Sequence, residues 1–326
     1  MRDLRISVTD RCNFRCTYCM PKEVFNSDYV FLERSRLLTF EEIERLVRVF
    51  VDLGVVKLRL TGGEPLLRRH LDNLVERLSQ IPEIEDTCLT TNGSLLTGEV
   101  ATRLAEAGLG RITISLDGLD NEVFQRLSDV QRPVDEVLEA IDHASAAGLG
   151  PVKINMVVKR GANEDQILPM AEHFRGTGHV LRFIEYMDVG NANDWKLDAV
   201  VPAEEILQVI DGQWPVEPAE PNYPGEVARR WRYRDGQGEI GVIASVTRPF
   251  CGGCHRARLS ADGMLYTCLF ASEGHDLKSL LRSGVDDAVL KRDLIRLWTD
   301  REDQYSELRT EATSKIKKVE MSYIGG

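Results

Sequence analysis

The chain lacks the features that would hold it to a membrane or to a nucleic acid. It has no run of 18 or more apolar residues, so no membrane-spanning helix is predicted. Its first residues lead straight into a strand-like pattern, with no apolar signal segment. Lys and Arg number 41 against 52 Asp and Glu, and this net charge of -11 argues against DNA or RNA binding. We therefore expect a cytoplasmic protein, in which a few focused arginines could still bind a small anion.

Six of the seven cysteines form two groups of three at opposite ends of the chain. The groups are Cys12, Cys16 and Cys19 (the first triad) and Cys251, Cys254 and Cys268 (the second triad). In a reducing compartment, clustered cysteines are more often metal ligands than disulfides. Cys88 stands alone inside a predicted strand, and we interpret it as a small buried hydrophobic residue.

The first 190 residues alternate strand patterns with helix patterns. Strands are predicted at 4–9, 56–61, 86–91, 111–116, 152–157 and 180–187, with a helix in each gap. This alternation predicts a parallel sheet, and six units are too few for a closed eight-stranded barrel. We predict an α/β fold, with a partial (βα)6 TIM-type barrel over residues 1–190 and ligands at the carboxyl ends of its strands.

Residues 191–326 have a different pattern and are predicted to form a C-terminal region that closes the barrel. Four prolines make 213–225 an extended connector. Short strands are predicted at 227–233, 239–246, 256–260 and 264–267, and helices near 277–282 and 286–298. The sequence Ala261-Asp262-Gly263 predicts a hairpin turn between the last two strands.

The first triad has the spacing Cys-x3-Cys-x2-Cys. Structural zinc nearly always takes four protein ligands, and no fourth Cys or His lies nearby, since His70 is the nearest histidine. A [4Fe–4S] cluster with three thiolates keeps one iron open for another ligand. The spacing alone leaves zinc and the cluster undecided.

Two motifs together resemble the radical SAM superfamily. Tyr18 completes a Cys-x3-Cys-x-aromatic-Cys motif after the first strand, and Gly62-Gly63-Glu64-Pro65 follows the second. The resemblance implies a [4Fe–4S] cluster whose open iron binds S-adenosylmethionine (SAM), which is cleaved to a 5′-deoxyadenosyl radical. It also implies a SAM-binding set of Tyr18, Gly62, Gly63, Glu64, Thr90, Ser115 and Met187.

The second triad, taken alone, fits zinc about as well as a cluster. A Cys-x2-Cys turn with a third cysteine on a neighbouring strand is common to both, and His255 or His275 could be a fourth zinc ligand.

The wider context of the second triad resembles the GTP 3′,8-cyclase family of molybdenum-cofactor biosynthesis. The resemblance lies in the segment from Cys251 to Ser260, the run from Arg182 to Asp188 and the terminal Gly325-Gly326. It implies a second [4Fe–4S] cluster that binds the guanine of GTP. It also implies hydrogen abstraction from C3′ and attack on C8, which give (8S)-3′,8-cyclo-7,8-dihydroguanosine 5′-triphosphate. A flavodoxin- or ferredoxin-type (or artificial) electron donor, a downstream cyclic pyranopterin monophosphate synthase and a homodimer are implied as well.

Six cationic side chains are candidates for binding the triphosphate: Arg5, Arg59, Lys153, Arg182, Arg256 and Arg258. The first four alternate with apolar neighbours on predicted strands, and the last two share one face of another. A charged group inside a barrel is costly without a partner, and a guanidinium suits phosphate oxygens. By the resemblance, Arg256, Arg258, Gly325 and Gly326 are catalytic, the two glycines as a mobile tail.

Two other functions stay open at this point. A peptide-modifying radical SAM enzyme also carries auxiliary clusters, although its C-terminal cysteine array is usually longer. A non-enzymatic zinc protein would use the same cysteines, but the missing fourth ligands and the acidic charge weigh against it.

Overall fold

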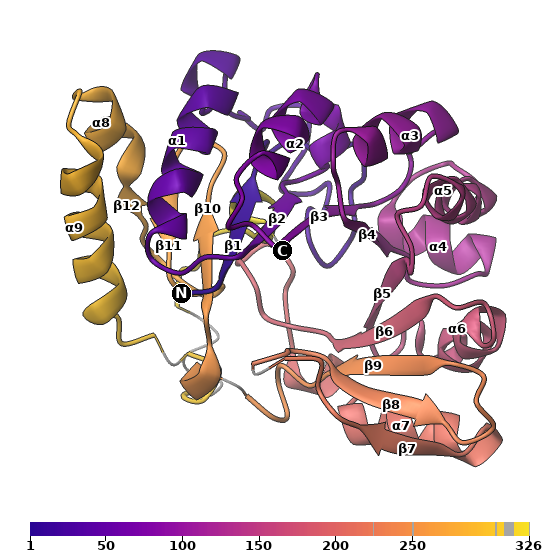
Figure 1. Cartoon of the computed structure of the whole chain (residues 1–326). Coiled ribbons are helices and arrows are strands. Elements are labelled where there is room, and N and C mark those ends of the chain that lie inside the picture. Colours follow the sequence, from indigo (N-terminus) through magenta and orange to yellow (C-terminus); the bar gives the residue numbers. More distant parts are fainter. Residues whose placement is uncertain (224, 250, 304, 310–315, 326) are drawn as a thin grey trace.

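The computed structural model describes residues 1–223, 225–249, 251–303, 305–309 and 316–325. Its centre is one sheet of twelve strands in the order β12-β11-β10-β1-β2-β3-β4-β5-β6-β9-β8-β7. The run from β10 to β9 is parallel throughout and curves into an open barrel (Figure 1). These parallel strands are β1 (Asp3–Ser7), β2 (Lys57–Thr61), β3 (Asp86–Thr91), β4 (Arg111–Ser115), β5 (Lys153–Val158), β6 (Val180–Glu185), β9 (Glu239–Ile243) and β10 (Arg256–Leu259).

Helices cover the outside of the barrel (Figure 1). They are α1 (Phe40–Val51), α2 (Leu71–Ser79), α3 (Gly98–Glu106), α4 (Asn121–Ser128), α5 (Asp135–Ala146), α6 (Ile167–Phe174), α7 (Ala203–Gln213), α8 (Leu277–Arg282) and α9 (Asp287–Thr299). The short helix α11 (Met321–Ile324) lies instead against β1 on the cavity side. Local sequence explains where α1 begins, because Thr39 and Glu42 form a reciprocal capping box. No helix within the described residues is long and apolar enough to cross a membrane.

The period of two along each strand separates the core from the barrel interior. On β1, Leu4 and Ile6 are fully buried in the hydrophobic core, whereas Arg5 between them lines an internal cavity. On β2, Leu58 and Leu60 are likewise in the core, and Arg59 lines the cavity. The apolar contacts that stabilise the sheet therefore lie on its outer face, and its inner face is free to be polar.

The predicted α/β partial barrel is confirmed, and the C-terminal region extends it at both edges. Although β9 and β10 are neighbours in sequence, β9 pairs with β6 and β10 pairs with β1. Antiparallel strands then continue each edge: β8 (Arg229–Tyr233) and β7 (Val216–Ala219) beyond β9, and β11 (Met264–Tyr266) and β12 (His275–Asp276) beyond β10. The division of the chain at residue 190 stays a prediction.

The connector predicted at 213–225 needs correction. Its residues 216–219 form β7, the outermost strand on that side of the sheet. Pro218 is tolerated there because an edge strand pairs on one side only. The predicted hairpin turn at 261–263 is confirmed, since β10 and β11 are antiparallel partners.

Candidate active site

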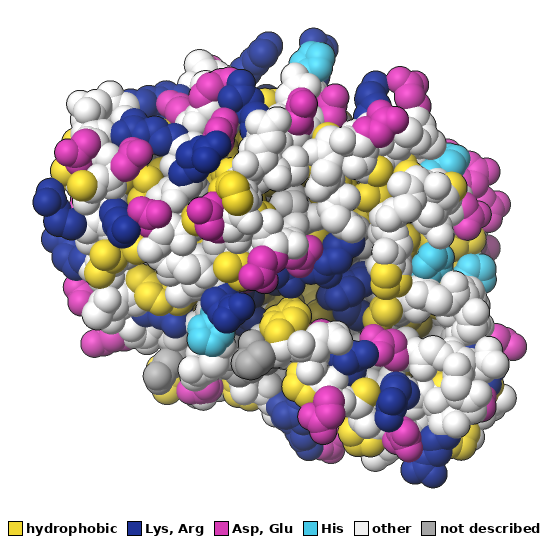
Figure 2. Space-filling model, viewed as in Figure 1, with side chains coloured by type: hydrophobic (Ala, Val, Ile, Leu, Met, Phe, Trp, Pro, Cys, Tyr) yellow, Lys and Arg dark blue, Asp and Glu magenta, His cyan; other side chains and the backbone are white. Residues whose placement is uncertain are grey.

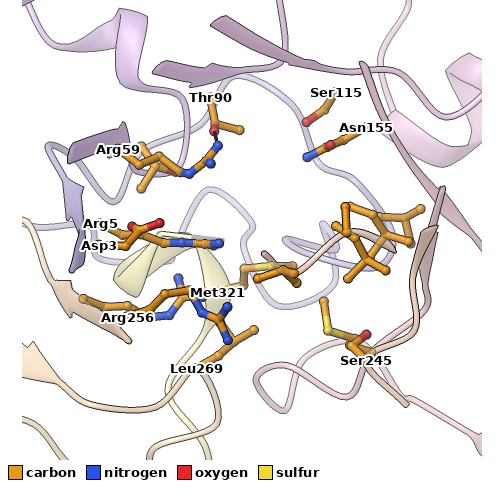
Figure 3. A pocket seen from close by; sticks show the side chains of 18 of the residues that line it. Asp3, Arg5, Arg59, Thr90, Ser115, Asn155, Ser245, Arg256, Leu269 and Met321 are labelled. Carbon is orange, nitrogen blue, oxygen red and sulfur yellow. Dashed lines mark hydrogen bonds between the residues drawn. The ribbon is translucent and has the colours of Figure 1, made fainter. Parts of the chain in front are cut away.

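One cavity of about 330 Å³ lies inside the barrel and brings the two triads together. All six triad cysteines line it, although the triads are more than 230 residues apart in sequence. All six predicted triphosphate-binding cations line it too: Arg5, Arg59, Lys153, Arg182, Arg256 and Arg258. In Figure 3, Arg5, Arg59 and Arg256 reach into the cavity from one side, and Ser115 and Asn155 face them from the other.

The first triad lies in the loop that follows β1, at the carboxyl end of the parallel strands. Backbone hydrogen bonds tie this loop to the end of α4, from Arg15 N to Ser128 O (3.0 Å) and from Thr17 N to Leu127 O (2.9 Å). The Tyr18 hydroxyl donates to Asp117 Oδ2 (2.6 Å), and Val157 N donates to the other oxygen of the same carboxylate (2.8 Å). Burial raises the pKa of Asp117 to about 6. The loop is therefore preformed by contacts that need no ligand.

The glycine pair after β2 lies directly on this loop. Gly63 N donates to Thr9 O (2.9 Å), and Glu64 N donates to Arg11 O (2.7 Å). A Cβ at Gly62 would lie 2.5 Å from Thr9 O, and one at Gly63 would overlap Arg11 O, so both positions require glycine. Such close backbone approach leaves Gly62 and Gly63 on the cavity wall beside the first triad.

Glu64 does not line the cavity, in contrast to the other predicted SAM-binding residues. Its carboxylate is buried and accepts from Thr91 Oγ1 (2.7 Å), Asn92 N (2.8 Å) and Leu66 N (3.0 Å). Burial raises the pKa of Glu64 to about 7. These bonds make Glu64 a brace for the loop after β3, while Tyr18, Gly62, Gly63, Thr90, Ser115 and Met187 line the cavity.

The second triad lies at the other end of the strands. Cys251 and Cys254 come directly before β10, and β10 is parallel to β1. Cys268 follows β11, which is antiparallel to β10, and so returns to the same end. Since the first triad follows β1 at its carboxyl end, the two triads face the cavity from opposite ends of the barrel.

The cations form a row across adjacent strands. In the register of the sheet, Arg5 lies beside Arg59 of β2 on one side and beside Arg258 of β10 on the other. Arg59 and Arg258 are buried, and the Nε atoms of Arg5, Arg59 and Arg182 are buried without a hydrogen-bond partner. Arg59 donates to Thr90 Oγ1 (3.1 Å), and Arg182 donates to Thr113 Oγ1 (3.3 Å). Within the part of the chain that the structure describes, neither has an ion pair with a carboxylate.

Crowding of these cations is visible in their pKa values. Burial and the nearby charge of Arg59 lower the pKa of Arg5 to about 10 and that of Arg182 to about 9. Burial and the charge of Arg111 lower the pKa of Lys153 to about 8. Figure 2 shows Lys and Arg side chains gathered in the hollow at the centre of the molecule. An interior with this excess of positive charge is suited to a ligand that carries several negative charges.

Comparison with known proteins assigns the family. The profile of the Radical SAM superfamily matches residues 6–174, and that of Molybdenum Cofactor Synthesis C matches residues 179–307. The GTP 3′,8-cyclase of Acidothermus cellulolyticus is 52% identical over all of this chain and 97% of its own length, and that of Xanthomonas axonopodis pv. citri is 53% identical over all of this chain and 96% of its own. The chain belongs to the radical SAM superfamily and, within it, to the GTP 3′,8-cyclase family.

A solved structure shares the fold. Streptococcus suis SuiB bound to S-adenosylmethionine aligns with a TM-score of 0.65 over 94% of this chain and 67% of its own, at 16% identity. At that identity the likeness extends to the fold alone.

Membership of the radical SAM superfamily implies a [4Fe–4S] cluster and SAM, and the first triad fits them. All seven cysteines are free thiols, and burial raises the pKa of Cys12 to about 11. Metal binding would release that proton. Cys12 Sγ already accepts from Phe14 N (3.4 Å), as a cluster thiolate could. Within the described residues, no three His, Cys, Asp or Glu side chains are placed to hold a single metal ion. A four-iron cluster does not need that arrangement, because each thiolate binds a different iron.

Several residues that line the cavity were not predicted from the sequence. Lys57, Arg111, Asn155, Ser245 and Met321 also line the cavity. Lys57 and Asn155 could have been found, since each lies two positions from a predicted cation on the same strand, Arg59 and Lys153. Ser245 and Met321 lie outside the strands, and no local pattern marks them.

The predicted tail is described only as far as Gly325, and Gly326 lies outside the described residues. The carbonyl of Gly325 accepts a hydrogen bond from the Arg258 guanidinium. Gly325 has φ +72°, and a Cβ there would overlap Thr61 Cγ2. Gly325 therefore occupies a space between β10 and the end of β2 that no other residue fits.

Proposed function

We propose that this protein converts GTP to (8S)-3′,8-cyclo-7,8-dihydroguanosine 5′-triphosphate, the first step of molybdenum-cofactor biosynthesis. The observation that carries the proposal is a single cavity with a cysteine triad at each end and a row of cations between them. Full-length identity of about half to named GTP 3′,8-cyclases supports the same substrate.

The proposed roles follow the position of each group. Arg5, Arg59, Lys153, Arg182, Arg256 and Arg258 bind the triphosphate, for which guanidinium forks are well suited. The second triad holds a second [4Fe–4S] cluster that binds guanine, and Cys268 Sγ accepts from Phe270 N (3.4 Å) in support of a thiolate there. Tyr18, Gly62, Gly63, Thr90, Ser115 and Met187 hold SAM at the first triad.

The cofactors, when bound, supply a 5′-deoxyadenosyl radical that can remove hydrogen from C3′ of the ribose. The chain's own contribution is to orient the ribose between the two ends and to exclude water. The apolar and aromatic lining beside the second triad, including Leu269 and Phe270, supports the exclusion of water. Arg256 and Arg258 are proposed as catalytic because β10 holds both of them beside the second triad, and Arg258 also donates to the carbonyl of Gly325 in the tail.

The test uses anaerobically reconstituted protein with SAM, a reductant and GTP deuterated at C3′. We expect the cyclised nucleotide, deuterium in 5′-deoxyadenosine, and about eight irons per chain, the sum of two four-iron clusters. Unlabelled 5′-deoxyadenosine with no cyclised product would overturn the proposed reaction. About four irons with one zinc would overturn the second cluster. The cytoplasmic location, the homodimer, the flavodoxin- or ferredoxin-type donor and the downstream cyclic pyranopterin monophosphate synthase stay predictions.

A further inference from the structure

The residues after α9 form a strap, defined here as 301–303, 305–309 and 316–325, that runs over the cavity. Its first part lies on the second triad. Arg301 donates to Cys254 O (2.8 Å), and Gly252 N donates to Glu307 Oε1 (3.2 Å). The Tyr305 ring stacks on Phe270, with centroids 4.6 Å apart.

A buried carboxylate in the loop after β6 holds the middle of the strap. Asp188 is 2% exposed and directly follows Met187, which lines the cavity on the side of the first triad. Its Oδ1 accepts from Arg309 Nε (2.9 Å), and its Oδ2 accepts from Lys318 Nζ (2.9 Å) and from the Tyr305 hydroxyl. Burial alone would raise the pKa of Asp188, but the Tyr305 hydroxyl and the two cations hold it below its ordinary value.

The loop after Asp188 adds a second grip on the strap. Asn191 Oδ1 accepts from Lys318 N (2.6 Å), and Asn191 N donates to Glu320 Oε1 (2.9 Å). Gly190 has φ +73°, and a Cβ there would overlap the Glu320 carboxylate. The loop and the strap are therefore held together by hydrogen bonds and packed so closely that residue 190 has no room for a side chain.

Beyond this grip the strap enters the catalytic cavity. Met321 lines the cavity, as Figure 3 shows, and α11 lies against β1. Gly325 then meets Arg258. Only a few residues separate Lys318 from Gly325, so the position of the first restricts the position of the second.

We infer that Asp188 is a positioning residue, whose buried contacts with Arg309 and Lys318 set the strap so that its end lies in the cavity. This inference rests on the proposed function for its catalytic consequence, but not for its structural one. Removing the charge of Asp188 leaves two buried cations without their carboxylate, an arrangement that favours release of the strap. Asp188 is not among the residues that line the cavity, and its side chain binds the strap, so we infer that its effect passes through the strap.

The test measures hydrogen exchange of residues 316–325 in the anaerobic holoenzyme for Asp188→Asn, Lys318→Met and the double variant. The matched control is Glu239→Gln, which removes a partly buried carboxylate from its ion pair with Arg230 on β8 and β9, away from the strap. We expect exchange in 316–325 to be at least about tenfold faster in both single variants, and the double variant to be no faster than either. Exchange elsewhere should match the control.

Activity provides the second readout. The Asp188 and Lys318 variants should still cleave SAM but form less cyclised nucleotide per 5′-deoxyadenosine, at nearly unchanged KM for GTP. Unchanged exchange in 316–325, or an acceleration spread over the whole chain, would overturn the inference. If Asp188→Asn fails to fold, Lys318→Met decides by the same criteria. If the parent protein forms no cyclised nucleotide, the proposed function is wrong. The hydrogen-exchange measurement still tests whether Asp188 positions the strap.

Discussion

Each end of the barrel holds a triad of cysteines, but the two triads are held in different ways. At the first end, Cys12, Cys16 and Cys19 share one loop, which backbone hydrogen bonds fix to α4 and to the glycine pair after β2. At the second end, Cys268 comes from a different strand end than Cys251 and Cys254. There the strap supplies side-chain contacts such as that of Arg301 with Cys254 O.

This difference predicts different dependence on the rest of the chain. Backbone bonds within the folded core persist as long as the domain is folded. A site assembled from side chains of a terminal segment can open locally without global unfolding. The second end is thus the part of the active site that can be lost separately from the first, and mutations should separate SAM cleavage from GTP cyclisation.

The largest expected effect comes from removing each triad. Changing Cys12, Cys16 and Cys19 together to Ala should abolish SAM cleavage, because the iron that binds SAM is lost. Changing Cys251, Cys254 and Cys268 should leave about four irons and some 5′-deoxyadenosine, with no cyclised nucleotide. Iron counting and chromatography of both products make the measurement.

The buried Cys88, whose thiol donates to Leu58 O (3.3 Å), provides the control for the triad experiment. Cys88→Ala should keep the full iron content and both products. Loss of SAM cleavage in the second-triad variant would mean that the two ends are not separable.

The next effect concerns the phosphate charge. Arg258→Ala should weaken GTP binding by about 2–5 kcal/mol, the cost of removing one partner of a buried charge pair. Binding of SAM at the other end should change little. Arg256→Ala should act in the same direction. Calorimetric titration with GTP and with guanosine makes the measurement, and an equal loss for both ligands would show that Arg258 does not act on the triphosphate.

The contrast between the ends also explains how far the sequence predicts the site. The first triad and the glycine pair are contiguous motifs, so their chemistry could be predicted from spacing and resemblance. The row Arg258–Arg5–Arg59 was predicted from the alternation along strands, although its lateral register needed the structure. The strap could not be predicted, because the ion pairs of Asp188 with Arg309 and Lys318 join residues more than 110 positions apart. Glu64 was predicted to bind SAM because it is part of the motif; in the structure its three hydrogen bonds brace the loop after β3, and SAM binding by Glu64 stays a prediction.

A smaller effect is expected at the tail, which touches both ends through Arg258 and Thr61. Placing Ala at both Gly325 and Gly326 should lower turnover by about 10- to 100-fold through misplacement of the tail, with fold, iron content and GTP affinity nearly intact. Turnover under saturating GTP and SAM is the measurement. A matched control is Gly212→Ala on α7, where an added Cβ meets no atom within 4 Å. Parental turnover in the double-alanine variant would show that the tail has no role.

The smallest expected effect is a pH dependence that sharpens the electrostatic part of the comparison. Lys153 has a pKa lowered to about 8 by burial and then by Arg111, so it loses its charge as the pH rises through 8. A bound triphosphate favours the charged form, and GTP affinity should therefore fall by about 2- to 4-fold between pH 7 and 8.5, a range that ends below the pKa of about 9 of Arg182. In Lys153→Arg the charge persists, and this fall should largely disappear.

The stability of the protein should respond to the titration of Lys153 in the opposite direction. Between pH 8 and about 10.4 the unfolded chain still holds the proton that folded Lys153 has released. The contribution of Lys153 to the free energy of unfolding thus rises with pH. A weaker binding of GTP at high pH therefore cannot be explained by a loss of fold stability caused by the titration of Lys153. Binding titrations and thermal denaturation of both proteins at each pH make the measurement, and the same pH profile in Lys153→Arg as in the parent would exclude Lys153 as the group responsible.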